Sequence, residues 1–243
     1  MKRMLTLTAV LGLVACSAGV ANADLLVNGN LDAGSGQSIT GWTKDESKSD
    51  SGPTTDLVTL EPWIEIAPIT NGGGDADQGG FVKSFQGNIN LVPPDLATLH
   101  LYQDVAGTPD MKYILTGHIG AGLNYSGLLD GPTKTELALE FDTDGDRGNG
   151  LLGSAVLDVK AAGLTSGAFP DFGAQEFMVM AVSPAGTTVV RARFSAIDMY
   201  ATQNPDQAAF IDDFSLICVP EPATVALVGL ALVGLAGFRR RSN

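Results

Sequence analysis

Closely spaced carboxylates are the first feature of the sequence that could do chemistry. Asp142, Asp144 and Asp146 lie at i, i+2 and i+4, with Gly145 between the last two. Carboxylates at this spacing can curl around one hard cation such as Ca²⁺, and glycine permits the tight turn. The run is not an EF-hand loop, because its glycine is in the fourth position and its twelfth residue is also glycine. The sequence therefore predicts either a surface calcium loop or a solvated acidic turn.

Aromatic residues could supply a platform for a sugar ring. Trp63 alternates with Ile64 and Ile66, so it faces solvent if the two isoleucines face the core. The alternative for Trp63 is packing under a loop. Tyr125 lies in a loop bordered by glycine and is a second candidate for carbohydrate binding. Trp42 follows a glycine, and we expect it in the core.

The sequence lacks the motifs of the common enzyme classes. His100 and His118 are its only histidines, and no nucleophile elbow, paired-histidine zinc motif or phosphate loop occurs. Two carboxylates could in principle form a glycosidase site, but nothing singles out a pair. We therefore expect a protein that is not an enzyme.

The charge of the chain restricts its partners. Once the five terminal lysines and arginines and Glu221 are set aside, nine basic and 26 acidic residues remain, a net charge of −17. Such a surface repels nucleic acid and anionic lipid, and it suits divalent cations or neutral partners. The two cysteines, Cys16 and Cys218, form no scaffold disulfide if the segment that contains Cys16 is removed.

Short apolar or alternating runs separated by glycine, proline, asparagine and aspartate recur through the middle of the chain. This pattern predicts an all-β domain, with about eight strands in a two-sheet sandwich. The expected strands span residues 63–66, 97–105, 112–119, 135–141, 151–160, 176–182, 187–195 and 209–217. Residues 71–80 and 125–134 are expected to be loops.

A series of short segments resembles the galactose-binding-like jelly rolls of carbohydrate-binding modules. The segments are Leu26–Asp32, Gly41-Trp42, Leu101–Val105, Tyr113–Gly117, Ser183–Thr187, Val189–Arg193 and Phe210–Leu216. The resemblance implies a jelly-roll β-sandwich and often a structural calcium ion. In that family Asp32 would share the ion with Asp212 or Asp213, whereas the alternative is hydrogen bonding to neighbouring turns. Sugar binding is implied less firmly, because many relatives of this fold are scaffolds.

The N-terminus has the form of a signal peptide over residues 1–23. Lys2 and Arg3 precede an apolar run, and Ala21-Asn22-Ala23 is a small-x-small cleavage site for signal peptidase after Ala23. Leu13-Val14-Ala15-Cys16 resembles a lipobox, which would instead lead to cleavage before Cys16 and its lipidation. An uncleaved anchor is the third alternative.

The C-terminus, residues 219–243, reads Val219-Pro220-Glu221-Pro222, then an uncharged apolar run to residue 238, then Arg239, Arg240 and Arg241. An apolar helix over 223–238 would be about 24 Å long, short for a bilayer core of about 30 Å. The prolines prevent the helix from extending backwards, so an extended peptide is left for a protease. The arginines would lie on the cytoplasmic side.

This order of motif, helix and basic cluster resembles the PEP-CTERM sorting signal of Gram-negative bacteria. The resemblance implies processing by an exosortase, transient anchoring in the inner membrane, and export to the cell surface or an exopolysaccharide matrix. A plain membrane anchor is the alternative. With the central domain at residues 24–218, we expect a structural, non-catalytic surface protein, or else a carbohydrate-binding module that docks to exopolysaccharide.

Overall fold

The computed structural model describes residues 23–49, 56–62, 64, 78–146, 150–168, 172–202 and 204–220. These residues contain twelve strands and two short 3₁₀ helices, η1 (Ser84–Gln86) and η2 (Ser126–Leu128). The strands are β1 (Gly34–Ser35), β2 (Ser38–Ile39), β3 (Thr43–Lys48), β4 (Val58–Glu61), β5 (Gly79–Val82), β6 (Ala97–Ala106), β7 (Met111–Ala121), β8 (Lys134–Asp142), β9 (Leu151–Asp158), β10 (Gln175–Val182), β11 (Val189–Met199) and β12 (Ala209–Pro220).

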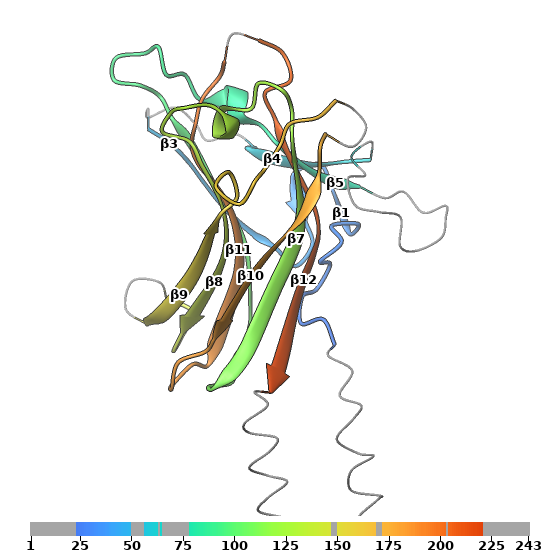
Figure 1. The fold of residues 1–243 in the computed structure, drawn as a ribbon, viewed down its shortest axis with the longest axis vertical. Helices are drawn as coiled ribbons and strands as arrows, with labels where there is room; N and C mark the ends of the chain where they lie inside the picture. Colours follow the sequence, from blue (N-terminus) through green and yellow to red (C-terminus); the bar gives the residue numbers. More distant parts are fainter. Residues whose placement is uncertain are drawn as a thin grey trace, which may run out of the picture.

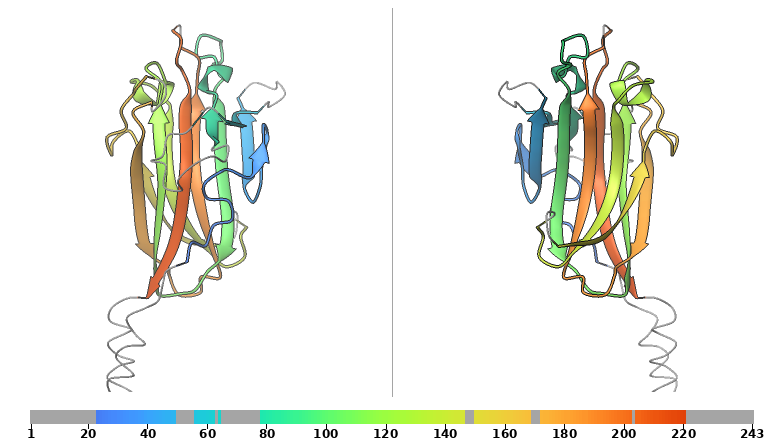
Figure 2. Two further views of the ribbon diagram at one scale, coloured as in Figure 1. Left: turned by 90° about the vertical axis from the view of Figure 1, so that its right-hand side faces the viewer. Right: turned by 90° about the vertical axis from the view of Figure 1, so that its left-hand side faces the viewer.

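Two five-stranded sheets pack face to face (Figures 1 and 2). One sheet has the order β10-β7-β12-β5-β4, the other β3-β6-β11-β8-β9, and every pairing is antiparallel. Strands β1 and β2 form a separate two-stranded hairpin. The predicted all-β sandwich is therefore confirmed.

The core follows from the alternation of side chains along the long strands. Leu99 and Leu101 on β6 are fully buried, as are Ala192 and Phe194 on β11, whereas their immediate neighbours face outward. Trp42 is in the core as predicted. Its indole N–H donates to the carbonyl oxygen of Asn28 at 2.9 Å, and its ring lies 5.2 Å from that of Phe214.

Strands β3, β4 and β5 were not among those that the sequence predicted. Strand β3 is built almost entirely from polar and charged residues, which is typical of an edge strand. Its Glu46 accepts the N–H of Leu57 at 3.0 Å, and Lys48 forms a 2.7 Å ion pair with Asp95. The charged side chains of β3 therefore bind neighbouring segments at the edge of the sandwich. The sequence of β3 shows no alternation of hydrophobic and polar residues that would have predicted a strand.

The prediction of a loop over residues 71–80 is wrong at its end, because Gly79 and Gly80 are buried in β5; residues 71–77 lie outside the described part. A Cβ at Gly79 would lie 2.6 Å from Ile64, and one at Gly80 would lie 2.6 Å from Ile211. Glycine is present here because neighbouring side chains approach the strand closely. Of the strand expected at residues 63–66, only Ile64 is described; it is fully buried and outside any strand.

The described chain enters and leaves the sandwich at the same end (Figure 1). The N–H of Leu25 donates to Leu216 O at 2.8 Å, and that of Leu216 donates to the carboxylate of Asp24 at 3.0 Å. The register brings the turns after β6, β8 and β10 to this end as well. We call it the tail end, and the opposite end the distal end.

Candidate functional site

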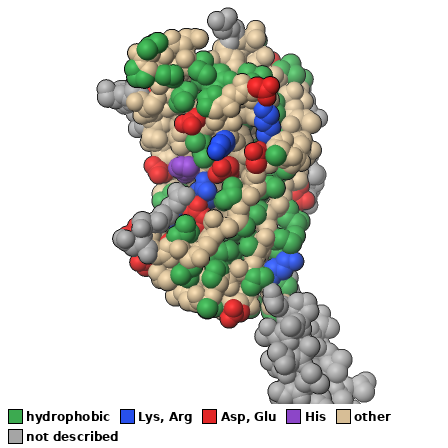
Figure 3. Space-filling view, turned by 60° about the vertical axis from the view of Figure 1, so that its left-hand side comes forward, with side chains coloured by type: hydrophobic (Ala, Val, Ile, Leu, Met, Phe, Trp, Pro, Cys, Tyr) green, Lys and Arg blue, Asp and Glu red, His purple; other side chains and the backbone are tan. Residues whose placement is uncertain are grey.

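The outer face of the β3-β6-β11-β8-β9 sheet carries rows of charged and polar side chains (Figure 3). The register places Arg191 between Asp104 and Glu140, and Ser195 between His100 and Glu136. Figure 3 shows acidic and basic side chains gathered beside a histidine over the middle of the sheet. We call this surface the polar face; its residues are His100, Tyr102, Asp104, Glu136, Glu140, Asp142, Arg191, Arg193 and Ser195.

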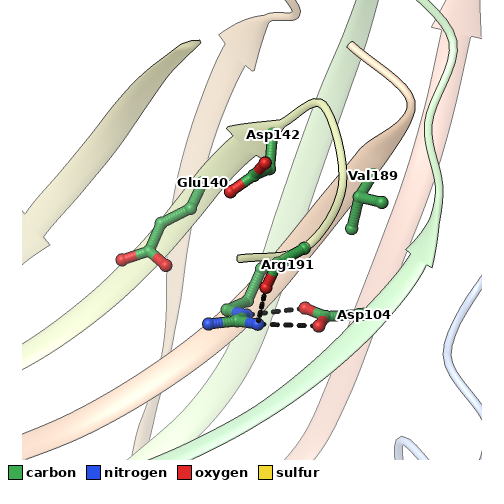
Figure 4. A pocket seen from close by; sticks show the side chains of 6 residues that line it. Asp104, Glu140, Asp142, Val189 and Arg191 are labelled. Atoms are coloured by element: carbon green, nitrogen blue, oxygen red, sulfur yellow. Dashed lines mark hydrogen bonds and ion pairs between the residues drawn. The ribbon is translucent and has the colours of Figure 1, made fainter. Parts of the chain in front are cut away.

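Arg191 is held from three sides, and Figure 4 shows its hydrogen bonds to Asp104 and to a main-chain oxygen. Its guanidinium donates to both carboxylate oxygens of Asp104, at 2.6 and 2.7 Å, and to the main-chain oxygen of Gly145 at 3.2 Å. The guanidinium carbon lies 3.9 Å from the centroid of the Tyr102 ring, a cation–π arrangement. The hydrogen bonds to Asp104 raise the pKa of Arg191 above its ordinary value. The bidentate pair therefore joins β11 to β6, and the bond to Gly145 ties the acidic turn to Arg191.

Arg193, two residues after Arg191 on β11, forms a second group of ion pairs. Its Nε donates to Glu140 at 2.9 Å, and its Nη1 lies 3.6 Å from the carboxylate of Glu136. The Arg193 and Glu140 side chains are 5% and 6% exposed, so this pair is nearly removed from water. Arg193 also contacts Ser195, whose hydroxyl lies 2.7 Å from Nδ1 of His100.

The polar face has little depth. Asp104, Glu140, Asp142, Gly145, Val189 and Arg191 surround a cavity of about 10 Å³ (Figure 4), which is roughly the room for one water molecule. Asp104, Glu136 and Glu140 each face an arginine. Arg191, Arg193 and Glu140 are themselves buried. The face presents to solvent the row on β6 that contains His100, Tyr102 and Asp104.

The three aspartates of the predicted calcium loop lie at the tail end: Asp142 ends β8, and Asp144 and Asp146 are in the turn that follows. Oδ1 of Asp142 accepts the N–H of Asp144, and Oδ1 of Asp144 accepts the N–H of Asp146, both at 2.9 Å. The hydrogen bond from the N–H of Asp144 is the largest cause of the lowered pKa of Asp142, and the N–H groups of Gly145 and Thr143 lower it further. A Cβ at Gly150 would collide with Oδ1 of both Asp142 and Asp144, so these two carboxylates converge there.

The second predicted metal site lies where the N-terminal segment meets β12. Asp213 has a positive φ of 46° at a bulge of β12, and its N–H donates to the buried Asp212 at 2.8 Å. Burial raises the pKa of Asp213; His118 opposes this and the charge of Asp32 adds to it. The charge of Asp32 thus acts on Asp213, while a calcium ion shared by the two stays a prediction. Asp32 also accepts the N–H of Gln78 at 3.2 Å. Hydrogen bonding of this kind is the alternative to calcium binding that the sequence left open for Asp32.

Neither acidic cluster amounts to a complete cation site by geometry. Within the residues that the structure describes, no three histidine, cysteine, aspartate or glutamate side chains are gathered closely enough to hold a metal ion. Calcium normally takes six to eight oxygen ligands, and two convergent carboxylates fall short of that. Calcium binding by Asp32, Asp142, Asp144, Asp146, Asp212 and Asp213 stays a prediction.

The proposed role of Tyr125 as a sugar platform is wrong. Tyr125 is completely buried, and its hydroxyl lies 2.9 Å from that of Thr135. This burial raises its pKa to about 12. The glycine-bordered loop turns inward because η2 follows at once and brings the ring under β8. Trp63, the other candidate platform, lies outside the described residues.

Among the residues predicted to act in C-terminal sorting, Pro220 is the one that belongs to the described sandwich. Pro220 is the last residue of β12, and it is paired with Met111 of β7. Ala23 is described and exposed, whereas Glu221, Pro222, Arg239, Arg240 and Arg241 lie outside the described part, as do residues 1–22 and the predicted helix at 223–238. In the part of the chain that is described, no helix has the length and apolar character to cross a membrane.

Sequence reasoning missed two features. The first is the set of arginine–carboxylate pairs on the polar face. The alternation Val190-Arg191-Ala192-Arg193 predicts that both arginines lie on one side of a strand, but it does not predict which carboxylates they bind. The other is a cavity of about 380 Å³ at the distal end, lined by Phe81, Phe85, Phe172, Asp206, Gln207, Ala208 and Phe210. No local pattern joins these residues, which come from separate loops and strands.

Comparison with protein families matches residues 219–241 to the PEP-CTERM protein-sorting motif. This motif indicates an exosortase-targeted extracellular protein with a membrane-anchoring sorting signal. The sequence has no match among curated proteins.

Several solved structures are similar to this chain. The enzymatically active domain of bacteriophage CBA120 tailspike protein 4 has a TM-score of 0.51 at 12% identity; the match covers 81% of this chain but 21% of that one. The carbohydrate-binding module TmCBM61 in complex with β-1,4-galactotriose has a TM-score of 0.42 at 12% identity, covering 80% of this chain and 98% of that one. The apo form of a cyclase from Fischerella sp. has a TM-score of 0.49 at 14% identity, covering 83% and 98%. At 12% identity, the similarity to the tailspike domain concerns the fold, which does not decide function.

Proposed function

We propose that the chain is an exosortase-processed protein of the cell surface or exopolysaccharide matrix, whose β-sandwich is a non-catalytic structural domain. The observation that carries this proposal is the junction at Pro220. The sorting motif matches from residue 219, and β12 ends at residue 220. The folded domain therefore adjoins the sorting signal without a linker. Signal peptidase and the exosortase are the processing partners, and the tail holds the domain at the inner membrane before release.

The state of the carboxylates on the polar face supports a non-catalytic role. A catalytic acid pair needs carboxyl groups that are free to contact the substrate. Asp104 is bound by Arg191, while Glu136 and Glu140 are bound by Arg193. Each of the three carboxylates is therefore already engaged by a guanidinium within the sheet. This arrangement is suited to stabilising a sheet surface.

Carbohydrate binding is the second candidate function, and the polar face favours it. Sugar hydroxyls pair well with charged donors and acceptors, and His100, Tyr102 and Asp104 line an outer row of this face, each partly accessible. A neutral exopolysaccharide would avoid repulsion by the acidic surface. Binding of isolated exopolysaccharide that His100→Ala weakens and the distal variant Phe85→Ala does not would support this candidate.

Cell fractionation tests the sorting proposal. Glu221→Ala, or deletion of Arg239–Arg241, should leave unprocessed chain in the inner membrane and remove it from surface material. Glu176→Ala, a change of the same kind on the exposed surface of β10, should be processed and exported normally. Normal export of the Glu221→Ala and deletion variants would contradict the proposal.

A further inference from the structure

The distal cavity is walled by phenyl rings on the side of the sheet that faces away from the main core. Phe81 and Phe210 are paired across β5 and β12, with ring centroids 5.8 Å apart. Phe172 stacks on Phe210, with centroids at 3.6 Å and planes within 12°. Because side chains alternate along β12, Ala209 and Ile211 enter the main core while Phe210 turns to this cavity.

One wall of the cavity is open to solvent. Phe85 is 43% exposed although its ring lies 6.1 Å from that of Phe81. An aromatic side chain held in this position loses little further freedom when a ligand ring packs on it. The cavity volume of about 380 Å³ lies in the range of small-molecule sites.

The polar groups of the cavity are few. The side-chain oxygen of Gln207 accepts the N–H of Thr202 at 2.6 Å, and its main-chain oxygen accepts the hydroxyl of Ser84. Among the described lining residues, Asp206 alone carries a charge, and it is exposed. A sugar needs several hydrogen-bonding partners around its ring, whereas this cavity offers aromatic surface and one carboxylate.

We propose that the distal cavity binds a small aromatic ring compound that carries a positively charged amine. The ring would pack against Phe85 and Phe172, because aromatic surfaces attract one another in offset or edge-to-face contact. The amine would lie towards Asp206, and phenyl rings also attract cations. The net charge of −13 raises the local concentration of cations further.

The position of the cavity is consistent with capture of a ligand from outside the cell. The cavity residues precede β12 or lie at its start, and the tail leaves from the other end of that strand. A domain tethered through Pro220 would therefore hold the cavity away from the membrane.

Calorimetric titration of the processed protein recovered from culture tests this inference with three probes. Tryptamine is expected to bind, and indole-3-propionate, which has the same ring with a negative charge, should bind roughly five- to tenfold more weakly. β-1,4-Galactotriose should not compete with tryptamine. Failure of tryptamine to bind at millimolar concentration, or displacement of tryptamine by the trisaccharide, would overturn the proposal.

Two variants locate the binding site and separate the contribution of ring packing from that of charge. Phe85→Ala should weaken both indole probes roughly tenfold, since it removes the exposed ring. Asp206→Asn should abolish the preference for tryptamine while leaving indole-3-propionate bound, and asparagine tolerates the positive φ of 61° at this position. Met180→Ala, an equally exposed apolar change on β10, serves as the control and should alter neither affinity. Unchanged binding by Phe85→Ala would contradict the assignment of the site.

Discussion

Arg191 donates two hydrogen bonds to Asp104, at 2.6 and 2.7 Å, and the two side chains differ in their access to water. The Arg191 side chain is 8% exposed and that of Asp104 is 35% exposed. The pair between Arg193 and Glu140 is more deeply buried on both sides. This difference sets the order of stability effects expected on the polar face.

Removal of Arg193 should cost more stability than removal of Arg191. Arg193→Met would take the guanidinium from a nearly buried carboxylate, and we expect a loss of about 3–5 kcal/mol in the free energy of unfolding. Arg191→Met would leave Asp104 in contact with water, so the loss should be about 1–2 kcal/mol. Urea denaturation measures both values.

The double change Arg193→Met and Glu140→Leu is the control for this comparison. It removes both charges, so most of the loss caused by Arg193→Met should be recovered. Equal effects of the two single arginine variants would show that burial does not govern these pairs.

The pH dependence of stability should report on Asp213. Burial, together with the charge of Asp32, raises the folded-state pKa of Asp213 above 3.8, although His118 opposes the shift. A raised carboxyl pKa means that the folded state binds the proton more tightly than the unfolded state. The contribution of Asp213 to stability therefore falls as the pH rises from about 3.8 through the folded-state pKa.

Asp213→Asn should accordingly stabilise the calcium-free protein at pH 7 and have little effect at pH 3, where the carboxyl is protonated in both states. Asparagine accepts the positive φ of 46°. Asp206→Asn is the matched control, because Asp206 also has a positive φ but is exposed. A loss of stability at pH 7 in the presence of chelator would contradict this account of Asp213.

Calcium should stabilise the domain if either acidic cluster binds it. At a concentration 100-fold above Kd the gain is about 2.7 kcal/mol, which corresponds to a rise in Tm of roughly 5–10 °C. Asp144→Asn should reduce the rise if the turn after β8 is the main site, and Asp213→Asn if the site near Asp32 dominates. Sodium at matched ionic strength should not reproduce it. The same Tm in chelator and in millimolar calcium would mean that the acidic clusters are solvated turns.

Strands β6 and β7 were predictable because buried and less buried residues alternate along most of their length. Residues 97–105 and 112–119, for example, were expected as strands and lie within β6 and β7. Strand β3 escaped prediction because its edge position lets charged residues occupy nearly all of it. Gly79 and Gly80 were mistaken for a loop because the close approach of Ile64 and Ile211 is a tertiary effect.

The candidate site was less predictable than the fold. Sequence spacing identified Asp142, Asp144 and Asp146 as neighbours, and the structure joins them through main-chain hydrogen bonds. Spacing could not show that Tyr125 turns inward, because the partner that its hydroxyl meets, Thr135, is on β8. The arginine pairs likewise depend on strand register, which is set by the whole sheet.

Processing by signal peptidase and an exosortase would set both ends of the mature chain. Intact-mass and peptide analysis of protein recovered from the cell surface or matrix measures both. We predict a first residue of Asp24 and loss of the segment that ends in Arg239–Arg241. A diacylated Cys16 at the N-terminus would instead support lipobox processing. A surface protein whose C-terminus is intact through Asn243 would contradict processing of this chain by an exosortase.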